Sequence, residues 1–202
     1  VDAPVLPGAL MYDDVVIEGD SYPFVEGLDS LKGMLARRFP SADDRARVDR
    51  FFAEFDKYQA LKGQSQLFFK LKVVSFLPSW LCALLQSLLC ASFLRSYVNQ
   101  SCEDLLRQCS IDPASRLAAV LLGQYGDFAY RPDQAAAFLL FGTISFYMNG
   151  ASYPRRGTGQ IPRKLNATVL AAGGISFVQA RVREVVIEKG RAVGVRMDDE
   201  EG

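Results

Sequence analysis

The segment from Asn149 to Leu165, NGASYPRRGTGQIPRKL, has the composition of a loop that could bind an anion. Gly157 and Gly159 would let the backbone approach a ligand closely, because glycine has no Cβ. A helix expected to begin at Pro162 would offer free N–H groups to a phosphate. Four cations add positive charge to the segment: Arg155, Arg156, Arg163 and Lys164. The alternative interpretation is a solvated basic turn without a ligand.

The composition of the chain limits which catalytic and metal sites it can contain. The 202 residues contain no histidine, which excludes Ser-His-Asp and Cys-His triads within the chain and the usual Cys/His zinc sites. No metal site is predicted, and the sequence indicates no catalytic residue. The four cysteines form no C-x-x-C pair, and we interpret them as small core residues rather than disulfides: Cys82, Cys90, Cys102 and Cys109. Balanced charges, 23 cations and 23 anions, argue against nucleic-acid binding.

The segment 149–165 does not match the glycine motif of a dinucleotide-binding fold. In G-x-G-x-x-G the third glycine lets a helix pack closely on the preceding strand. Here Gly157 and Gly159 are followed by Pro162 at that place, and an apolar helix precedes the segment instead of a strand. A dinucleotide-binding unit would therefore have to lie elsewhere.

The elements before the segment are mostly helical in pattern. We expect a strand at 15–17 and helices that begin at Leu28, after a Ser41 cap, after a Ser101 cap, at Pro113 after an Asp112 cap, and at Pro132. The helix after Ser41 carries large apolar side chains at helical spacing: Val48, Phe51, Phe52, Phe55 and Tyr58. The helix from Pro132 to Met148 is apolar nearly all round and is expected to be buried, with an interruption at Gly142.

An uncharged run of 22 residues lies between Lys72 and Arg95. Pro78 breaks it and leaves 16 residues behind, fewer than the roughly 20 that a membrane-spanning helix needs. The run 73–94 is therefore either a helix that lies in a membrane interface or a buried helix in a large core.

The residues after this segment show both helix and strand patterns. A helix from Pro162 should end at Gly173-Gly174, followed by a strand at 175–178 and a hairpin of strands 182–187 and 192–197 around Lys189-Gly190. The fold class is therefore α+β, with a helical domain at 1–150 and a second segment at 151–202. Because the chain begins without Met and stops directly after a strand pattern, we expect an internal fragment of a longer protein.

Two stretches carry a resemblance to a known family. YPRRGTGQIPRKLNATVLAAGG and then VREVVIEKGRAVGVRM resemble the YPRGG segment and following hairpin of the flavin-dependent carotenoid and retinoid oxidoreductases. This family includes phytoene desaturases, carotene isomerases and retinol saturases, and the layout of the chain is most similar to the retinol saturase branch. The resemblance covers most of the chain and is strongest from Gly123 to Met197. One departure is Arg156, which stands where the motif has its first glycine.

The resemblance implies a division of labour between the two segments. Residues 1–150 would bind the substrate, and 151–202 would return to a Rossmann-like FAD-binding domain of the glutathione-reductase type, whose N-terminal dinucleotide-binding unit is missing. The expected FAD-binding residues are Tyr153, Pro154, Arg155, Gly157 and Val182. Candidates to line an apolar substrate tunnel, which could equally be core residues, are Phe138, Phe141, Phe146 and Tyr147.

The implied function is an FAD-dependent oxidoreductase acting on C–C bonds of a polyene lipid, with NAD(P) as a possible electron partner. We expect the fragment alone to be inactive. The expected partners are a lipophilic polyene and a membrane surface, with location at the endoplasmic reticulum or a plastid. Two alternatives stay open: a non-catalytic, membrane-associated lipid-binding protein, and an FAD-dependent amine or porphyrinogen oxidase.

Overall fold

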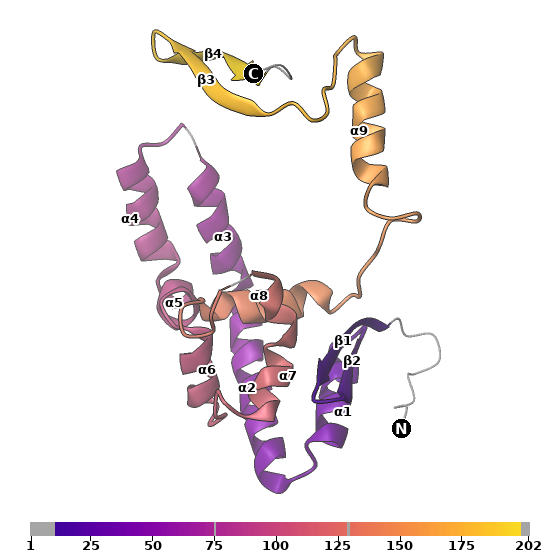
Figure 1. Cartoon of the computed structure of the whole chain (residues 1–202). Coiled ribbons are helices and arrows are strands. Elements are labelled where there is room, and N and C mark those ends of the chain that lie inside the picture. The colour runs from indigo at the N-terminus through magenta and orange to yellow at the C-terminus, as the bar shows by residue number, and fades with distance from the viewer. Residues whose placement is uncertain (1–10, 75, 129, 199–202) are drawn as a thin grey trace. The chain divides into compact units, whose positions relative to one another are not determined.

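The computed structural model describes residues 11–74, 76–128 and 130–198 (Figure 1). The chain divides into two compact units, Val1–Ala151 and Ser152–Gly202. Its fold class is α+β, as predicted: helices dominate, and the described strands form two antiparallel two-stranded sheets.

The first unit begins with a β-hairpin and a helix. Strands β1 (Met11–Ile17) and β2 (Asp20–Val25) pair across a two-residue turn, and helix α1 (Leu28–Arg38) follows. Glu18 and Gly19 have φ values of 52° and 88°, the left-handed geometry that matches the twist of a tight hairpin. The predicted strand at 15–17 is confirmed, as is the helix beginning at Leu28.

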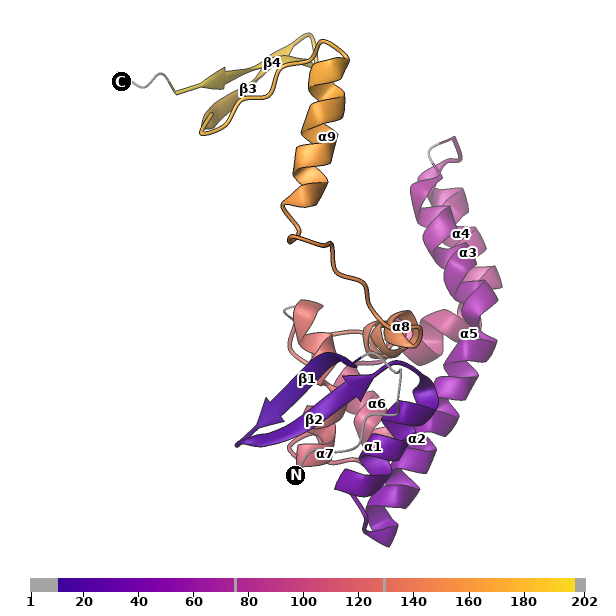
Figure 2. The ribbon, with the colours of Figure 1, turned by 90° about the vertical axis from the view of Figure 1, so that its right-hand side faces the viewer.

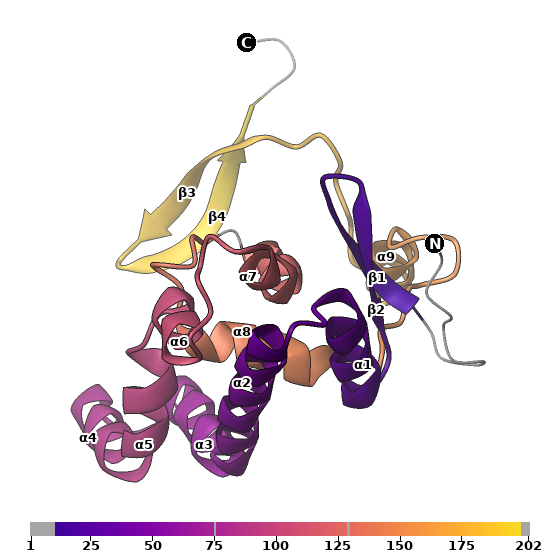
Figure 3. The ribbon, with the colours of Figure 1, turned by 90° about the horizontal axis from the view of Figure 1, so that it is seen from below.

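The core of the first unit forms where two helices cross. Helix α2 (Ala42–Ala60) begins at Ser41, whose hydroxyl accepts the Asp44 N–H at 3.0 Å, so the predicted cap is confirmed. Helix α8 (Ala137–Tyr147) lies across α2 (Figure 3). Phe141 of α8 is fully buried, with its ring 5.2 Å from that of Phe51 and 5.5 Å from that of Phe55. The aromatic row predicted along α2 is therefore core.

Two helices leave this body as a hairpin. Helix α3 (Lys62–Val73) and helix α4 (Ser79–Leu89) project side by side from the rest of the unit (Figures 1 and 2). Helix α5 (Ala91–Phe93) and the π-helical turn η1 (Leu94–Val98) bring the chain back to the core. Among the described residues, no single helix is both long and apolar enough to cross a bilayer. Two helical segments, Ser79–Leu89 and Ala91–Val98, together have the length and composition of a membrane span, but the chain bends by 80° between them.

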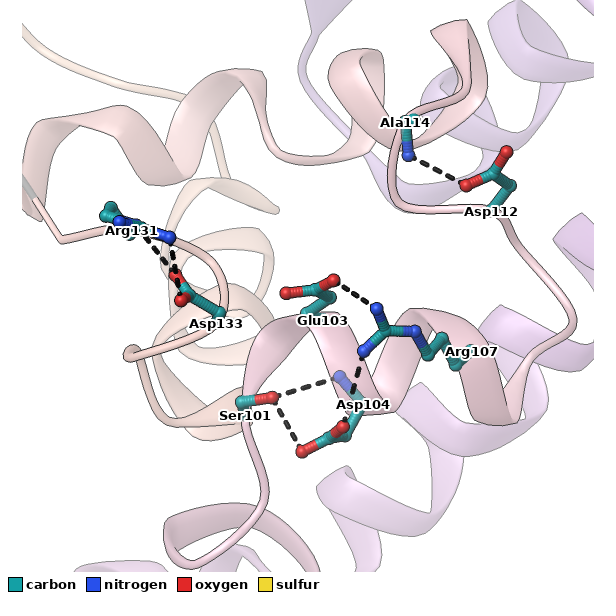
Figure 4. A network of polar contacts seen from close by, with 8 residues as sticks. All are labelled: Ser101, Glu103, Asp104, Arg107, Asp112, Ala114, Arg131 and Asp133. Atoms are coloured by element: carbon teal, nitrogen blue, oxygen red, sulfur yellow. Dashed lines mark hydrogen bonds and ion pairs between the residues drawn. The ribbon is translucent and has the colours of Figure 1, made fainter.

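Side-chain hydrogen bonds determine where the next two helices begin (Figure 4). Helix α6 (Cys102–Gln108) begins at Ser101, whose hydroxyl accepts the Asp104 N–H at 3.0 Å, as predicted. Helix α7 (Arg116–Leu121) begins later than predicted, because Asp112 accepts the Ala114 N–H at 3.0 Å and so closes a turn before the helix. Ser115 is the actual cap, and the 3₁₀ helix η2 (Gly123–Phe128) follows α7.

The prediction that α8 begins at Pro132 was also wrong. Residues 132–134 form a turn, and Ala136 is extended because it pairs with Ser101, in the chain entering α6. The Cys102 N–H donates to the Ala135 carbonyl and the Ala137 N–H to the Gln100 carbonyl, each at 2.8 Å. Tertiary pairing therefore overrides the helix signal of the proline. Helix α8 runs on through Gly142 without the predicted interruption.

The cysteines have the predicted role. All four are free and buried: Cys82, Cys90, Cys102 and Cys109. Burial raises the pKa of Cys102 and that of Cys109 to about 11, so both thiols stay protonated near neutral pH. They act as small core residues and do not provide a nucleophile.

The second unit consists of one helix and one hairpin. Helix α9 (Gln160–Ala171) ends as predicted: the Gly174 N–H donates to the Val169 carbonyl and Gly173 has a φ of 80°, a Schellman motif. Strands β3 (Val182–Glu188) and β4 (Arg191–Met197) form the predicted hairpin around Lys189-Gly190, both with positive φ. The predicted strand at 175–178 is wrong, because these residues pair with no other strand.

Candidate functional site

An apolar pocket of about 490 Å³ lies in the first unit, between α2, α3 and α8. This volume falls within the usual range for small-molecule sites, about 300–1,000 Å³. Its lining is mainly aromatic and small: Tyr58, Phe69, Phe138, Leu139, Gly142, Thr143, Phe146 and Tyr147. Such a surface suits a flat apolar ligand, because aromatic faces offer large contact areas in fixed geometry.

Helix α8 supplies most of the lining through its spacing. Phe138, Gly142 and Phe146 are four residues apart and therefore share one helical face. Gly142 leaves space between the two rings; a Cβ there would lie 3.6 Å from the Tyr58 hydroxyl oxygen. Phe141 points to the other side, into the core, and is 0% exposed, whereas Phe146 is 75% exposed.

The pocket presents few polar groups. The Thr143 hydroxyl already donates to the Leu139 carbonyl at 2.8 Å within α8. Burial raises the pKa of Tyr58, so its hydroxyl is a neutral hydrogen-bonding group at physiological pH. Tyr147 stacks on Tyr12 of β1 at 5.3 Å, which fixes one end of the lining. The pocket therefore favours a largely apolar ligand with at most a small polar group.

The structure separates the four predicted tunnel residues. Phe138, Phe146 and Tyr147 lie in the pocket lining, and Phe141 lies in the core. The sequence did not indicate four of the lining residues, Phe69, Leu139, Gly142 and Thr143, and it assigned Tyr58 only to the core. The α8 residues could have been found from their shared face with Phe138 and Phe146. Phe69 could not, since its place depends on how α3 packs against α8, where its ring lies 5.7 Å from that of Phe138.

The second candidate region is the loop that opens the second unit. The Gly157 N–H donates to the Pro154 carbonyl at 2.9 Å and closes a turn. Arg156 occupies this turn with a φ of 69°, and Gly157 has a φ of 88°. Arg156 thus takes the left-handed conformation that glycine adopts without strain. The backbone keeps a glycine-type geometry at the position where the resemblance leads one to expect glycine.

The side chains of this loop point outward. Tyr153 is 75% exposed, and Arg155 and Arg156 are also exposed, while Pro154 and Gly157 are half-buried. No heavy atom lies within 4 Å of a Cβ built on Gly157, so its backbone is open to a ligand. Val182 lies apart in sequence as the first residue of β3, where it pairs with Met197 and is 50% exposed.

The start of α9 does not provide the free N–H groups expected from the sequence. The helix begins at Gln160 rather than Pro162. The Gln160 N–H donates to the Gly157 carbonyl at 3.2 Å, and the Ile161 N–H to the Thr158 carbonyl at 3.0 Å. Pro162 has no N–H. Anion binding by this helix terminus is therefore a wrong prediction, and positive charge in the loop comes from side chains alone.

No family model and no solved structure matches this chain. The chain is similar to all-trans-retinol 13,14-reductase of Homo sapiens, with 27% identity over 191 residues, 91% of this chain. The proteins of the same name from Macaca fascicularis and Rattus norvegicus are 26% and 29% identical over 197 residues, 94% of this chain. The chain spans only 30–31% of the length of these relatives.

Proposed function

We propose that this chain is the lipid-binding part of an oxidoreductase that acts on a carbon–carbon bond of a retinoid or a related polyene. One observation carries the proposal: an aromatic pocket lies within a stretch that is similar, along nearly its whole length, to proteins named all-trans-retinol 13,14-reductase. The identity of 26–29% supports the reaction class more strongly than the particular polyene.

The pocket lining supports the substrate class. A conjugated polyene is flat and apolar, and it would lie between the rings of Phe138 and Phe146 over the gap left by Gly142. The hydroxyls of Tyr58 and Tyr147 would face a single polar end group, such as an alcohol. These residues would bind and orient the substrate and exclude water.

We propose FAD as the cofactor, bound in part by the second unit. Tyr153, Pro154, Arg155 and Gly157 would contact it at the loop, and Val182 would lie beside the adenine. The residues present fit a partial contact: the loop offers exposed cations and an open glycine backbone. They do not fit pyrophosphate binding at the start of α9, where the N–H groups are already used. FAD, when bound, would supply hydride exchange, with NAD(P) as the electron partner.

We further propose that residues 151–202 are a returning segment of a Rossmann-like FAD-binding domain whose dinucleotide-binding unit lies outside these 202 residues. The hairpin carries exposed apolar side chains, which a larger domain would cover: Val182, Val185, Ile187, Val193 and Val195. Location on the membrane of the endoplasmic reticulum or a plastid completes the proposal.

The absorption spectrum tests the cofactor assignment. Expressed from its complete reading frame, the protein should purify yellow, whereas residues 1–202 alone should not bind FAD tightly. Arg155→Ala should lower the flavin content, and Arg191→Ala, which changes another exposed arginine at the start of β4, should not. A colourless protein that takes up no added FAD would contradict the proposal, as would sub-micromolar FAD binding by residues 1–202.

A further inference from the structure

The α3–α4 hairpin, residues 62–89, is held together by few but specific contacts. The Gln86 side-chain amide of α4 donates to the Phe68 carbonyl of α3 at 2.9 Å. Phe68 and Cys82 are buried, at 6% and 8% exposure. At the base, the Gln64 side chain accepts the Phe93 N–H at 3.1 Å and ties the hairpin to the core. The hairpin is therefore a defined element with an inner and an outer face.

The outer face and the tip of the hairpin are apolar. Trp80, Leu84 and Leu88 are four residues apart along α4, and they are 67%, 46% and 67% exposed. Val73 at the end of α3 is 80% exposed, and Phe76 in the connection is 84% exposed. Large side chains at such exposure, adjacent in space, mark a surface that contacts an apolar partner. The prediction that the run 73–94 is a buried helix does not hold for this face.

The charges around this face favour an anionic partner. From Lys57 to Cys102 the sequence contains no Asp or Glu. Lys57 is paired with Glu54, which lies just before this stretch. The remaining cations of the stretch are all exposed, and none forms an ion pair with another described residue: Lys62, Lys70, Lys72 and Arg95. Lys70 and Lys72 lie in the last turn of α3, beside the apolar tip, and their long side chains can extend to anionic headgroups while the apolar side chains contact acyl chains.

The length of the hairpin limits how deep it can reach. Helix α4 has 11 residues and is therefore about 16 Å long at 1.5 Å per residue. The hydrocarbon core of a bilayer is about 30 Å thick. Trp80 lies at the start of α4, next to the tip of the hairpin, so it would enter the leaflet together with Phe76. The hairpin can therefore enter one leaflet.

The apolar face also continues to the pocket. Phe69 is 45% exposed on α3 and at the same time lines the pocket beside Phe138. A lipid that leaves the leaflet along α3 would pass Val73 and meet the pocket at Phe69, which lies one helical turn away on the same face. The hairpin and the pocket thus share a wall.

We propose that the α3–α4 hairpin inserts into one leaflet of an anionic bilayer and that the lipophilic ligand enters the pocket from this leaflet at Phe69. The second half of this proposal rests on the proposed function, because it takes the pocket to be the substrate site. The first half depends only on the exposed face and its charges.

The test uses vesicles that contain neither retinoid nor flavin, so that its outcome is independent of the proposed enzyme activity. Trp80 is the only tryptophan of the 202 residues, and its emission reports on the hairpin directly. On phosphatidylcholine vesicles containing phosphatidylserine, the emission should shift to the blue, and the protein should float with the vesicles. Lys70→Glu/Lys72→Glu should weaken this binding by at least about fivefold per lysine, and pure phosphatidylcholine should bind less.

Matched variants separate the hairpin from general stickiness. Phe76→Ser/Leu84→Ser/Leu88→Ser keeps Trp80 as reporter and should lower vesicle partitioning at least about tenfold. The control Ile175→Ser/Phe177→Ser/Val178→Ser removes three side chains of equal or greater exposure from the second unit and should bind like the original chain. An unshifted Trp80 emission in the presence of anionic vesicles would overturn the proposal, even if the triple variant failed to fold. Equal loss of binding in the control would overturn it as well.

Discussion

Phe141 and Phe146 lie five residues apart on α8, and the structure assigns them opposite roles. Phe141 is fully buried among the rings of Phe51, Phe55 and Tyr58. Replacing it with Ala should cost about 3–5 kcal/mol of unfolding free energy. At about 2–4 °C per kcal/mol for a chain of this size, the melting temperature should fall by about 6–20 °C. Phe146 is 75% exposed, so Phe146→Ala should change stability by no more than about 0.5 kcal/mol.

The same pair should separate in ligand binding. Full burial of a Phe side chain contributes about 1.5–3 kcal/mol, and a ligand could cover roughly the three-quarters of Phe146 that is exposed, about 1–2 kcal/mol. Phe146→Ala should therefore raise the Kd for all-trans-retinol by about 5- to 30-fold. The assay is fluorescence titration with retinol, beside thermal unfolding by circular dichroism; Phe177→Ala, 71% exposed in the second unit, is the control. Unchanged retinol affinity in Phe146→Ala, or an unchanged melting temperature in Phe141→Ala, would refute this assignment.

Three further predictions follow from local geometry. Gly123→Ala would place a Cβ against the Val15 side chain, so it should lower the free energy of unfolding, measured in urea, by about 1–3 kcal/mol. Adding Val15→Ala should recover part of this loss. If the effects of the two substitutions are strictly additive, the contact does not exist. Because burial raises the pKa of Cys102 and of Cys109 to about 11 from 9.0, the unfolded chain loses these protons first, and stability should fall as pH rises from 9 to 11. The double variant Cys102→Ala/Cys109→Ala should show a flatter decline, and an equally steep one would argue against buried neutral thiols. Because Arg156 has a φ of 69°, the Arg156→Gly variant should have a free energy of unfolding about 1 kcal/mol higher than the Arg156→Ala variant. If the Ala variant is instead the more stable of the two, the turn is not left-handed.

The elements that were predicted correctly are those whose signals are local. Ser41 and Ser101 cap helices because a hydroxyl needs only the N–H three residues ahead. The Lys189-Gly190 turn and the Schellman end at Gly173 likewise depend on neighbouring residues alone. The sequence is sufficient to predict such caps and turns, because they do not depend on contacts with distant parts of the chain.

The failures occur where distant contacts decide. Pro132 does not begin α8, because Ala136 pairs with Ser101, about 35 residues earlier in sequence. The face shared by Phe138 and Phe146 could be predicted from helical spacing, but the burial of Phe141 depends on the crossing of α2. The start of α9 failed as an anion site for a local reason instead: the carbonyls of Gly157 and Thr158, three residues earlier, already accept its N–H groups.

We propose that this chain belongs to the machinery that reduces a carbon–carbon double bond of a retinoid, and one measurement tests this directly. The direct measurement incubates the protein, expressed from its complete reading frame, with FAD, a reductant and all-trans-retinol, and analyses the product by mass spectrometry. We expect a product heavier by two hydrogens, formed more slowly by Phe146→Ala and at the original rate by Phe177→Ala. Retinol recovered unchanged while the bound flavin is reduced, or a flavin that instead oxidises an amine or a porphyrinogen, would contradict it.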